Sequence, residues 1–304
     1  MPSLLERLPE RSRVAVIRLR SLGDCVLSTP GLRLLKQTRP DLSLAVAVED
    51  GFRDVYAGNP DIDAILPPHL SALRRWRPAL CLNLHGGTRS AWMTFLSGAR
   101  WRAGFGHYRF PGIYNLLIPR AQETLGGERP VHTAEHVASA MFHLGVPMVE
   151  IPRAVLVADG QPELSPGSYA IIHPFASRAD KTWPAERFLA VAARLRSDGL
   201  EPVFLGGPRD DATPFQAFRT LAARPLSEIK TWMRDAALFV GNDSGPAHLA
   251  AGFGIPAVVL FGSSDPSTWY PWRTASAVLQ SPEGISAIAA ERVMEATARL
   301  RVAA

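Results

Sequence analysis

The segment Ala236–Phe261 decides the fold. It reads AALFV (Ala236–Val240), GNDSGPAHLAA (Gly241–Ala251), GFGIP (Gly252–Pro256) and AVVLF (Ala257–Phe261). Two short apolar runs enclose a polar turn and a stretch of helical character, which predicts a strand, a turn, a helix and a second strand. Pro246 suits the first helical position, because its missing N–H would be unpaired there in any case.

The polar side chains of this segment gather at the turn. Asp243, Ser244 and His248 follow the carboxyl end of a predicted strand, where open α/β sheets bind ligands. The free amides and the positive end of the helix dipole attract phosphate at such a place. Alternatively, Ser244 only caps the helix and Asp243 fills the turn. Because capping does not account for His248 and the two glycines, the turn favours an anion site.

The same pattern of apolar strands and helices recurs along the chain. Further strands are predicted at Val14–Leu19, Leu42–Val48, Ile62–Leu66, Ala79–Leu84, Tyr169–His173 and Pro202–Leu205. Helices are expected at Cys25–Thr38, Ser90–Ala99, Glu135–Leu144, Pro184–Ser197, Pro214–Ala222, Ser227–Asp235 and from Ile285 to about Arg301. Continuous apolar strands separated by helices are typical of parallel sheets covered on both faces. We expect an α/β protein with two facing, Rossmann-like doubly wound domains and a cleft between them.

The chain is long enough for two such domains. We place an N-terminal domain at residues 1–150, a Pro- and Gly-rich connection at 151–167 and a second domain at 168–284. Residues 285–304 are expected to form a helix that packs back on the first domain.

Composition narrows the class of protein. Of 304 residues, 47% are hydrophobic and 20% charged, as in a globular protein. Cys25 and Cys81 are the two cysteines, too few for a disulfide framework, and are expected to be core residues in a reducing compartment. The start, Met1–Arg13, is charged and lacks the apolar region of a secretory signal, so we expect a cytoplasmic protein.

The net charge of +5 favours anionic substrates or an anionic membrane face. A merely solvated basic surface is the alternative. Nucleic acid is not expected as a partner, because no long basic run or aromatic-basic stripe is present.

Three more features bear on chemistry. The loop Arg18–Asp24 places Asp24 at a helix start, where it is either a general base or a residue stabilised by the helix dipole. It lacks the glycines of a dinucleotide site, and no Walker A sequence occurs. In the loop His173–Pro184, Lys181 suits a phosphate contact or is an ordinary surface lysine. In Gly206–Asp210, Asp210 either receives sugar hydroxyls or caps a helix.

One motif is rejected. His132–His136 reads HTAEH and matches a zinc-protease pattern, but it lacks a clear third ligand on a helix. We interpret it as an ordinary polar helix start, and we expect neither a metal site nor a cofactor.

The chain resembles glycosyltransferase family 9, the ADP-heptose:lipopolysaccharide heptosyltransferases, over nearly its whole length. The motifs that carry the resemblance are RLRSLGDCVLSTP (Arg18–Pro30), HPFASRADKTWP (His173–Pro184), GNDSGPAHLAA (Gly241–Ala251) and FGSSDP (Phe261–Pro266). The resemblance implies a GT-B fold and metal-independent transfer with inversion at the anomeric carbon. The substrates would be an ADP-sugar, expected to be ADP-heptose, and an anionic glycolipid acceptor of the lipopolysaccharide-core type.

The resemblance also implies roles for particular residues. Asp24 would be the general base and Lys181 would contact donor phosphate. The expected donor site is Ser177, Lys181, Asp210, Asp243, Ser244, Gly245 and His248, and the acceptor candidates are Arg20, Ser21, His85 and Arg89. The family frequently has threonine at Ser244 and glutamate near Asp210, and a fuller strand in place of Phe218–Pro225.

Two basic segments contain tryptophan, Arg74–Arg77 and Arg100–Arg102. They would contact acceptor phosphates or the inner membrane. Alternatively, they are exposed arginines whose aliphatic stems lie along the protein surface. Two other classes stay open: a different GT-B enzyme, such as another nucleotide-sugar transferase or a sugar epimerase, and a non-catalytic sugar-nucleotide-binding protein.

Overall fold

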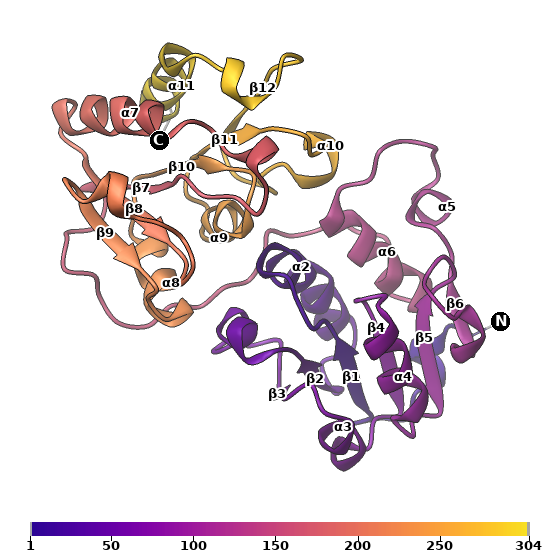
Figure 1. Cartoon of the computed structure of the whole chain (residues 1–304). Helices are drawn as coiled ribbons and strands as arrows, with labels where there is room; N and C mark the ends of the chain where they lie inside the picture. The colour runs from indigo at the N-terminus through magenta and orange to yellow at the C-terminus, as the bar shows by residue number, and fades with distance from the viewer. Residues whose placement is uncertain (1, 303–304) are drawn as a thin grey trace. The chain divides into compact units, whose positions relative to one another are not determined.

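The computed structural model describes residues 2–302. The chain divides into two compact units, one ending at Val157 and the other beginning at Ala158. Each unit is built around one six-stranded sheet, with helices on both of its faces (Figure 1). The predicted fold class, two doubly wound α/β units, is confirmed.

The strands of the first unit are β1 (Arg13–Ile17), β2 (Ser43–Ala47), β3 (Ala64–Leu66), β4 (Leu80–Asn83), β5 (Trp101–Phe105) and β6 (Leu116–Ile118). Its α-helices are α1 (Leu4–Arg7), α2 (Leu22–Thr38), α3 (Leu70–Trp76), α4 (Thr88–Leu96), α5 (Ala121–Leu125) and α6 (Thr133–Leu144). Two 3-10 turns, η1 (Asp50–Val55) and η2 (Pro111–Ile113), complete it.

The strands of the second unit are β7 (Tyr169–His173), β8 (Glu201–Gly206), β9 (Arg219–Ala222), β10 (Leu238–Asn242), β11 (Ala257–Phe261) and β12 (Ser276–Gln280). Its α-helices are α7 (Ala185–Ser197), α8 (Leu226–Arg234), α9 (Gly245–Phe253), α10 (Pro266–Trp269) and α11 (Ala290–Val302). The 3-10 turns are η3 (Ala179–Lys181), η4 (Thr213–Phe215) and η5 (Ile285–Ala287).

Both sheets have the same strand order. The first runs β3-β2-β1-β4-β5-β6 and the second β12-β11-β10-β7-β8-β9, and the strand pairs are parallel. Counted within its own unit, each is therefore the 3-2-1-4-5-6 sheet of a Rossmann-like fold. The order reverses between β1 and β4 in one unit and between β7 and β10 in the other.

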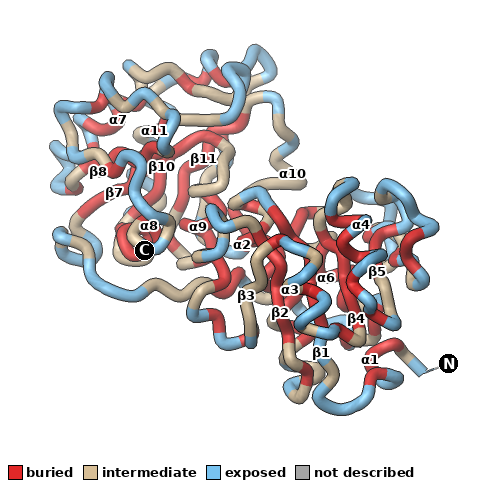
Figure 2. The backbone as a smooth tube through the Cα atoms, turned by 60° about the horizontal axis from the view of Figure 1, so that its bottom comes forward, coloured by how far each residue is buried: buried red, intermediate tan, exposed pale blue. Residues whose placement is uncertain are grey.

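The central strands are the apolar runs of the sequence. Val14–Ile17 of β1 and Leu238–Val240 of β10 are completely buried, because helices cover both faces of each sheet (Figure 2). The central strands are mostly red in Figure 2.

The helix predicted at Pro214–Ala222 is wrong. The segment forms the short turn η4 and then the strand β9, which pairs with β8 in parallel. Phe215, Phe218 and Leu221 recur at a helical spacing, but the rings of Phe215 and Phe218 pack on Phe204, at centroid distances of 4.4 and 5.4 Å. Three further strands, β5, β6 and β12, were not predicted.

The helix α11 belongs to the second unit, and not to the first as the sequence suggested. Val293 and Ala296 of α11 lie in one core cluster with Ile172 of β7 and Val258 of β11. Its apolar face is therefore occupied by its own domain. The predicted connection 151–167 contains the division between the units, and no regular element occurs between Leu144 and Tyr169.

Candidate active site

Two rims of polar side chains lie at the points where the strand order reverses. In the first unit, the loops that follow β1 and β4 meet, since Ile17 pairs with Asn83 at the ends of these strands. In the second unit, the loops that follow β7 and β10 meet, since His173 pairs with Gly241. Loops at such positions form the ligand-binding crevice of doubly wound sheets. We call them the β1–β4 rim and the β7–β10 rim.

Asp24 lies in the first turn of α2, on the β1–β4 rim. One carboxylate oxygen accepts a hydrogen bond from the hydroxyl of Ser21 at 3.0 Å and faces the Ser21 amide at 3.4 Å. The other oxygen accepts from the guanidinium of Arg18. The carboxylate is thus held in place from two sides while remaining about one quarter exposed, which suits a group that meets a substrate.

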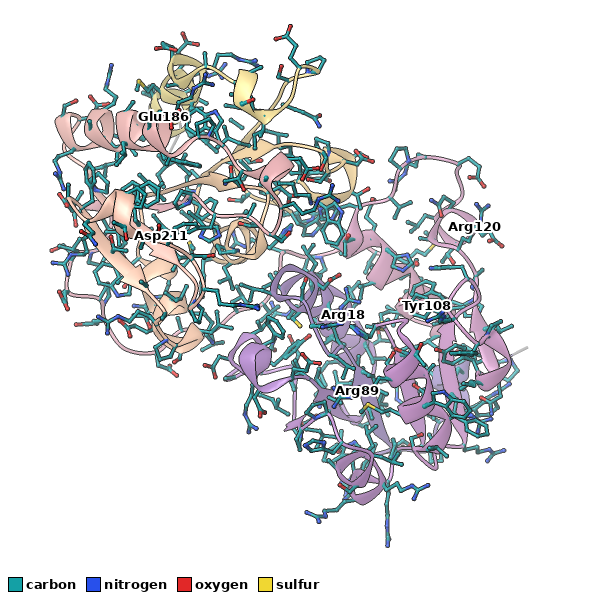
Figure 3. The ribbon with its side chains drawn as sticks, viewed as in Figure 1. Arg18, Arg89, Tyr108, Arg120, Glu186 and Asp211 are labelled. Carbon is teal, nitrogen blue, oxygen red and sulfur yellow. The ribbon has the colours of Figure 1, made fainter. Side chains whose placement is uncertain are left out.

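No function was predicted for Arg18, but the structure shows that it positions Asp24. It follows β1 directly and is 7% exposed, and its guanidinium donates both to the carbonyl of Leu84 and to Asp24. A buried guanidinium requires such partners, because an unpaired buried charge is costly. Figure 3 shows Arg18 near Tyr108, whose hydroxyl donates to the same carbonyl at 3.2 Å.

The acceptor candidates divide into two groups. Ser21 contacts Asp24 directly, and His85 is close enough to Arg18 and Arg20 for their charges to act on it. Burial and these two arginines lower the pKa of His85, so its imidazole is neutral near pH 7. Arg89 instead donates to the carbonyl of Pro68 at 2.6 Å and faces Glu49 at 3.4 Å.

Lys181 and Asp243 meet on the β7–β10 rim. The ammonium of Lys181 lies 3.4 Å from the carboxylate of Asp243, which also accepts a hydrogen bond from the Ser264 hydroxyl. The lysine comes from the loop after β7, the aspartate from the end of β10 and the serine from the loop after β11. Three neighbouring strands therefore build this cluster.

Gly262 explains why Lys181 can reach this position. A Cβ atom on Gly262 would lie 2.0 Å from the carbonyl oxygen of Asp180 and 2.9 Å from the Cα of Lys181. Such contacts are sterically impossible, so only glycine lets the loop after β7 pass this close to the end of β11.

The helix α9 begins at this rim. Ser244 is its N-cap residue, and Gly245 and Pro246 are its first two residues, so Pro246 lies one position later than predicted. The hydroxyl of Ser244 donates to the carbonyl of Asn242 at 3.0 Å and makes no capping bond. His248 is 3% exposed, with its ring 6.0 Å from that of Trp269, so it presents little surface to a ligand.

Asn242 holds the two loops of the rim together. Its side-chain amide donates to the carbonyl of Pro174 at 2.8 Å, and its oxygen accepts from the backbone amide of Trp183 at 3.1 Å. The side chain is completely buried between β10 and the loop that carries Lys181. This role of Asn242 was not predicted, although a polar residue at the end of an apolar strand is a signal for it.

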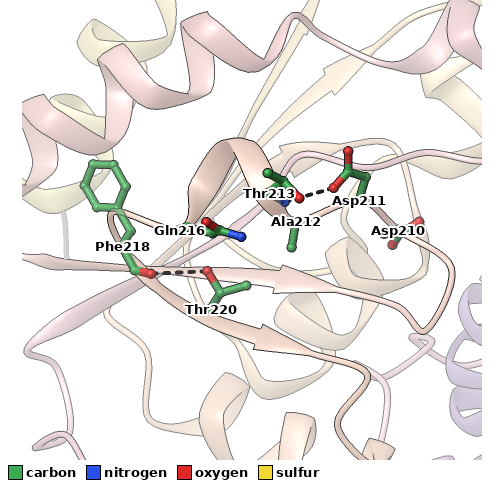
Figure 4. A pocket seen from close by; sticks show the side chains of 7 residues that line it. All are labelled: Asp210, Asp211, Ala212, Thr213, Gln216, Phe218 and Thr220. Carbon is green, nitrogen blue, oxygen red and sulfur yellow. Dashed lines mark hydrogen bonds between the residues drawn. The ribbon is translucent and has the colours of Figure 1, made fainter.

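Ser177 and Asp210 lie in other parts of the same unit's loops. Ser177 is exposed in the loop after β7. Asp210 accepts a hydrogen bond from the Gly207 amide at 2.7 Å and lines an open pocket of about 470 Å³ with Asp211, Ala212, Thr213, Gln216, Phe218 and Thr220 (Figure 4). One of its oxygens is thus engaged within its own turn.

The HTAEH motif is a helix cap. The ring of His132 accepts from the Ala134 amide at 3.1 Å, and Glu135 accepts from the His132 amide at 3.0 Å and pairs with Arg129 at 2.7 Å. These are the reciprocal bonds of a capping box. Among residues 2–302, no group of three or more His, Cys, Asp or Glu side chains is arranged to hold a metal ion.

Both cysteines are core residues, as predicted. Cys25 and Cys81 are free and completely buried, and burial raises the pKa of each thiol to about 12. Neither is therefore a nucleophile at neutral pH. Within the described residues, no helix has the length and apolarity needed to span a bilayer.

Two doubly wound α/β units of this kind are the architecture of the GT-B fold. The family model of glycosyltransferase family 9 (heptosyltransferase) matches residues 69–296 of the 304-residue chain. The chain belongs to this family and is a glycosyltransferase, so the predicted resemblance is confirmed.

Known proteins agree with this assignment. The chain is 25% identical over 292 residues to lipopolysaccharide heptosyltransferase 3 of Escherichia coli K12, covering 84% of this chain and 83% of that protein. The fold is that of the family 9 glycosyl transferase from Veillonella parvula, with a TM-score of 0.84, 21% identity and coverage of 97% and 98% of the two chains. The E. coli heptosyltransferase WaaC with ADP has a TM-score of 0.77 at 20% identity, over 95% of this chain and 99% of that one.

Proposed function

We propose that this protein transfers a heptose-like sugar, with inversion, from an ADP-sugar to an anionic acceptor of the lipopolysaccharide-core type. The observation that carries the proposal is the pair of rims: a held but accessible carboxylate, Asp24, on one unit, and a lysine at a helix N-terminus, Lys181 beside α9, on the other. We assign the acceptor to the first unit and the nucleotide sugar to the second.

In the proposed reaction, Asp24 accepts the proton of the acceptor hydroxyl while its oxygen attacks the anomeric carbon. The new glycosidic bond forms on one face of the sugar as the bond to the diphosphate breaks on the other. The products are the inverted glycoside, ADP and a protonated Asp24. Arg18 and Ser21 hold the carboxylate in a single orientation, which is what a general base requires.

The leaving diphosphate gains negative charge, and we propose that Lys181 and the N-terminus of α9 stabilise it. A lysine ammonium and free helix amides stabilise a transition state most strongly when they are already in position before the reaction. We propose that they take the place of a metal ion, so that transfer proceeds without one. Ser177, Asp210, Ser244 and Gly245 complete the proposed donor site.

The acceptor side of the proposal rests on charge. Arg20 is exposed beside His85 and Asp24, and an anionic acceptor would meet it on the way to the base. A glycolipid acceptor lies in a membrane, so we also propose that the protein works at the cytoplasmic face of one. The two free, buried thiols are compatible with that location.

The deciding experiment compares donors. Titration calorimetry with ADP, UDP and GDP is expected to show ADP binding most tightly, and transfer from ADP-heptose to a lipid-free core oligosaccharide is expected to yield a product of inverted anomeric configuration by NMR. Tenfold tighter binding of UDP would assign the protein to another donor class. ADP binding without any turnover would make it a sugar-nucleotide-binding protein.

A further inference from the structure

The helix α4 carries large apolar side chains on its solvent side. On its solvent side lie Trp92, Phe95 and Leu96, which are 48%, 46% and 40% exposed. Its buried side carries Ala91 and Met93, which join core clusters, and Ser90 and Thr94, whose hydroxyls donate to carbonyls of the preceding turn at 2.8 Å each. A surface helix ordinarily exposes polar residues opposite its core side, so packing against the core does not account for Trp92, Phe95 and Leu96.

A second exposed ring extends this surface. Phe110, next to η2, is 43% exposed, and its ring lies 6.3 Å from that of Trp92, which in turn meets Phe95 edge-on at 5.9 Å. Phe110 has φ of 62°, a left-handed conformation that is costly for a bulky residue. We call Trp92, Phe95, Leu96 and Phe110 the α4 face.

Three arginines border the α4 face. Arg109 donates to the hydroxyl of Thr88 at the start of α4, at 3.2 Å, and Arg74 donates to the carbonyl of Leu96 at its end, at 2.9 Å. The guanidinium of Arg102 lies 5.7 Å from the ring of Phe95. Both ends and one flank of the face are therefore positive.

This surface belongs to the most basic part of the chain. Between Asp63 and Glu123 the sequence holds eight arginines and no acidic residue, which leaves 25 basic against 28 acidic residues elsewhere. Two of the eight, Arg89 and Arg120, pair with carboxylates from outside the stretch. The net positive charge of the protein thus originates here.

We propose that the α4 face docks into the headgroup layer of an anionic membrane. Tryptophan and phenylalanine favour the boundary between headgroups and acyl chains, and arginines around them pair with lipid phosphates. A second copy of this chain fits less well, because a symmetric contact through this face would bring its arginines against each other. An acidic protein partner would account for the arginines but not for the cluster of exposed rings.

The test is flotation with lipid vesicles at 100 mM salt. Wild-type protein is expected to bind phosphatidylcholine vesicles containing 30% phosphatidylglycerol and to bind pure phosphatidylcholine at least tenfold more weakly. The double variant W92S/F95S is expected to lose about tenfold in binding to the anionic vesicles, because it removes two rings that insert at the lipid boundary. Arg109→Glu is also expected to lose about tenfold, because it replaces a basic residue at this surface by an acidic one.

A matched control removes apolar surface elsewhere in the same unit. Met148 and Val149 are 63% and 53% exposed, and the double variant M148S/V149S is expected to bind vesicles like the wild type. Circular dichroism and thermal unfolding establish that the variants are folded. Equal vesicle binding by W92S/F95S and the wild type overturns the proposal. So does a wild-type dimer in light scattering that W92S/F95S abolishes, because it assigns the face to a second copy.

The inference does not depend on the proposed reaction. Vesicle binding is measured without donor or acceptor. Transfer to a lipid-free acceptor fragment is expected to be the same for W92S/F95S and the wild type, since the α4 face contains none of the proposed site residues. Loss of vesicle binding with normal transfer supports docking, whereas absence of transfer in the wild type contradicts only the proposed function.

Discussion

Lys181 and Asp243 are separated by 62 residues in the chain, yet the lysine ammonium lies 3.4 Å from the aspartate carboxylate. The contact exists because β10 is the direct neighbour of β7, so the loops that follow the two strands meet. Without a ligand, Asp243 balances the charge of the lysine and fixes its direction. In the proposed function, the donor diphosphate would compete with Asp243 for that charge.

Replacing Lys181 by alanine is therefore expected to weaken both ADP binding and turnover. A charge-assisted contact of about 1.5–3 kcal/mol corresponds to about 10- to 100-fold in affinity. Calorimetry with ADP measures the effect. Lys36→Ala is the matched control, because Lys36 also pairs with an aspartate, Asp63 at 2.8 Å, but in the other unit. Unchanged ADP affinity in Lys181→Ala would show that Lys181 is a surface lysine without a role in donor binding.

Asp24→Asn is expected to leave ADP affinity nearly unchanged and to slow the chemical step by about 10²-fold or more, because the amide cannot accept the proton. Single-turnover transfer is the measurement. Ser21→Ala is the companion variant, since it removes the hydroxyl that donates to the same carboxylate at this helix start. If Asp24 serves only this helix start, both variants lower the melting temperature and neither slows transfer markedly.

Gly262→Ala is expected to weaken ADP binding although it adds only one methyl group. The new Cβ would overlap the Asp180 carbonyl, so the loop carrying Lys181 must move away from Asp243. Gly51→Ala, where a Cβ meets nothing within 4 Å, is the control. The readout is ADP affinity relative to melting temperature. Wild-type affinity in Gly262→Ala would show that the position of this loop is unimportant for the donor.

Folding stability is expected to fall as the pH is lowered from 6.5 towards 4. Burial, together with neighbouring His107 and Arg18, lowers the pKa of His136 to about 4. Below pH 6.5 this histidine is therefore protonated in the unfolded chain but still neutral in the folded protein. The difference lowers the free energy of unfolding by about 3 kcal/mol at pH 4. Urea unfolding between pH 4.5 and 7.5 measures the slope.

In His136→Gln the slope is expected to be smaller, although the absolute stability also falls because the imidazole is stacked on Phe105 at a centroid distance of 4.0 Å. The slope does not vanish, since the pKa values of His85, His107 and His173 are lowered too. An identical slope in variant and wild type would mean that His136 titrates normally in the folded protein.

Transfer is expected to continue in EDTA at the untreated rate, because Lys181 and the N-terminus of α9 are proposed to carry the charge of the leaving diphosphate. The assay uses protein dialysed against EDTA, followed by addition of Mg²⁺ or Mn²⁺. Activity that is lost on dialysis and restored by either ion would contradict the metal-free mechanism.

The sequence alone determined the class of fold. Strands buried on both faces must be apolar along their whole length, so Tyr169–His173 and Ala257–Phe261 were predicted with the bounds that β7 and β11 have. Edge strands carry a weaker signal because one side is not covered. The edge strands β6, β9 and β12 were missed or misassigned, and a helical spacing of rings at β9 was misleading. The edge strand β3 was nevertheless predicted, and the interior strand β5 was missed because it begins with the half-buried Trp101 and Arg102.

The sequence also indicated which polar residues follow strands, including Asp24, Lys181 and Asp243. Only the tertiary structure decided which of them meet. The order of strands in each sheet brings Lys181 to Asp243 and the Leu84 carbonyl to Arg18, and Gly262 leaves the space that the first contact needs. The exposure of Trp92 and Phe95 on α4 was likewise not predicted, because which side of a helix faces the core depends on the sheet beneath it. Hydrophobicity along a chain is a local property, whereas adjacency of loops follows from pairing between strands far apart in sequence.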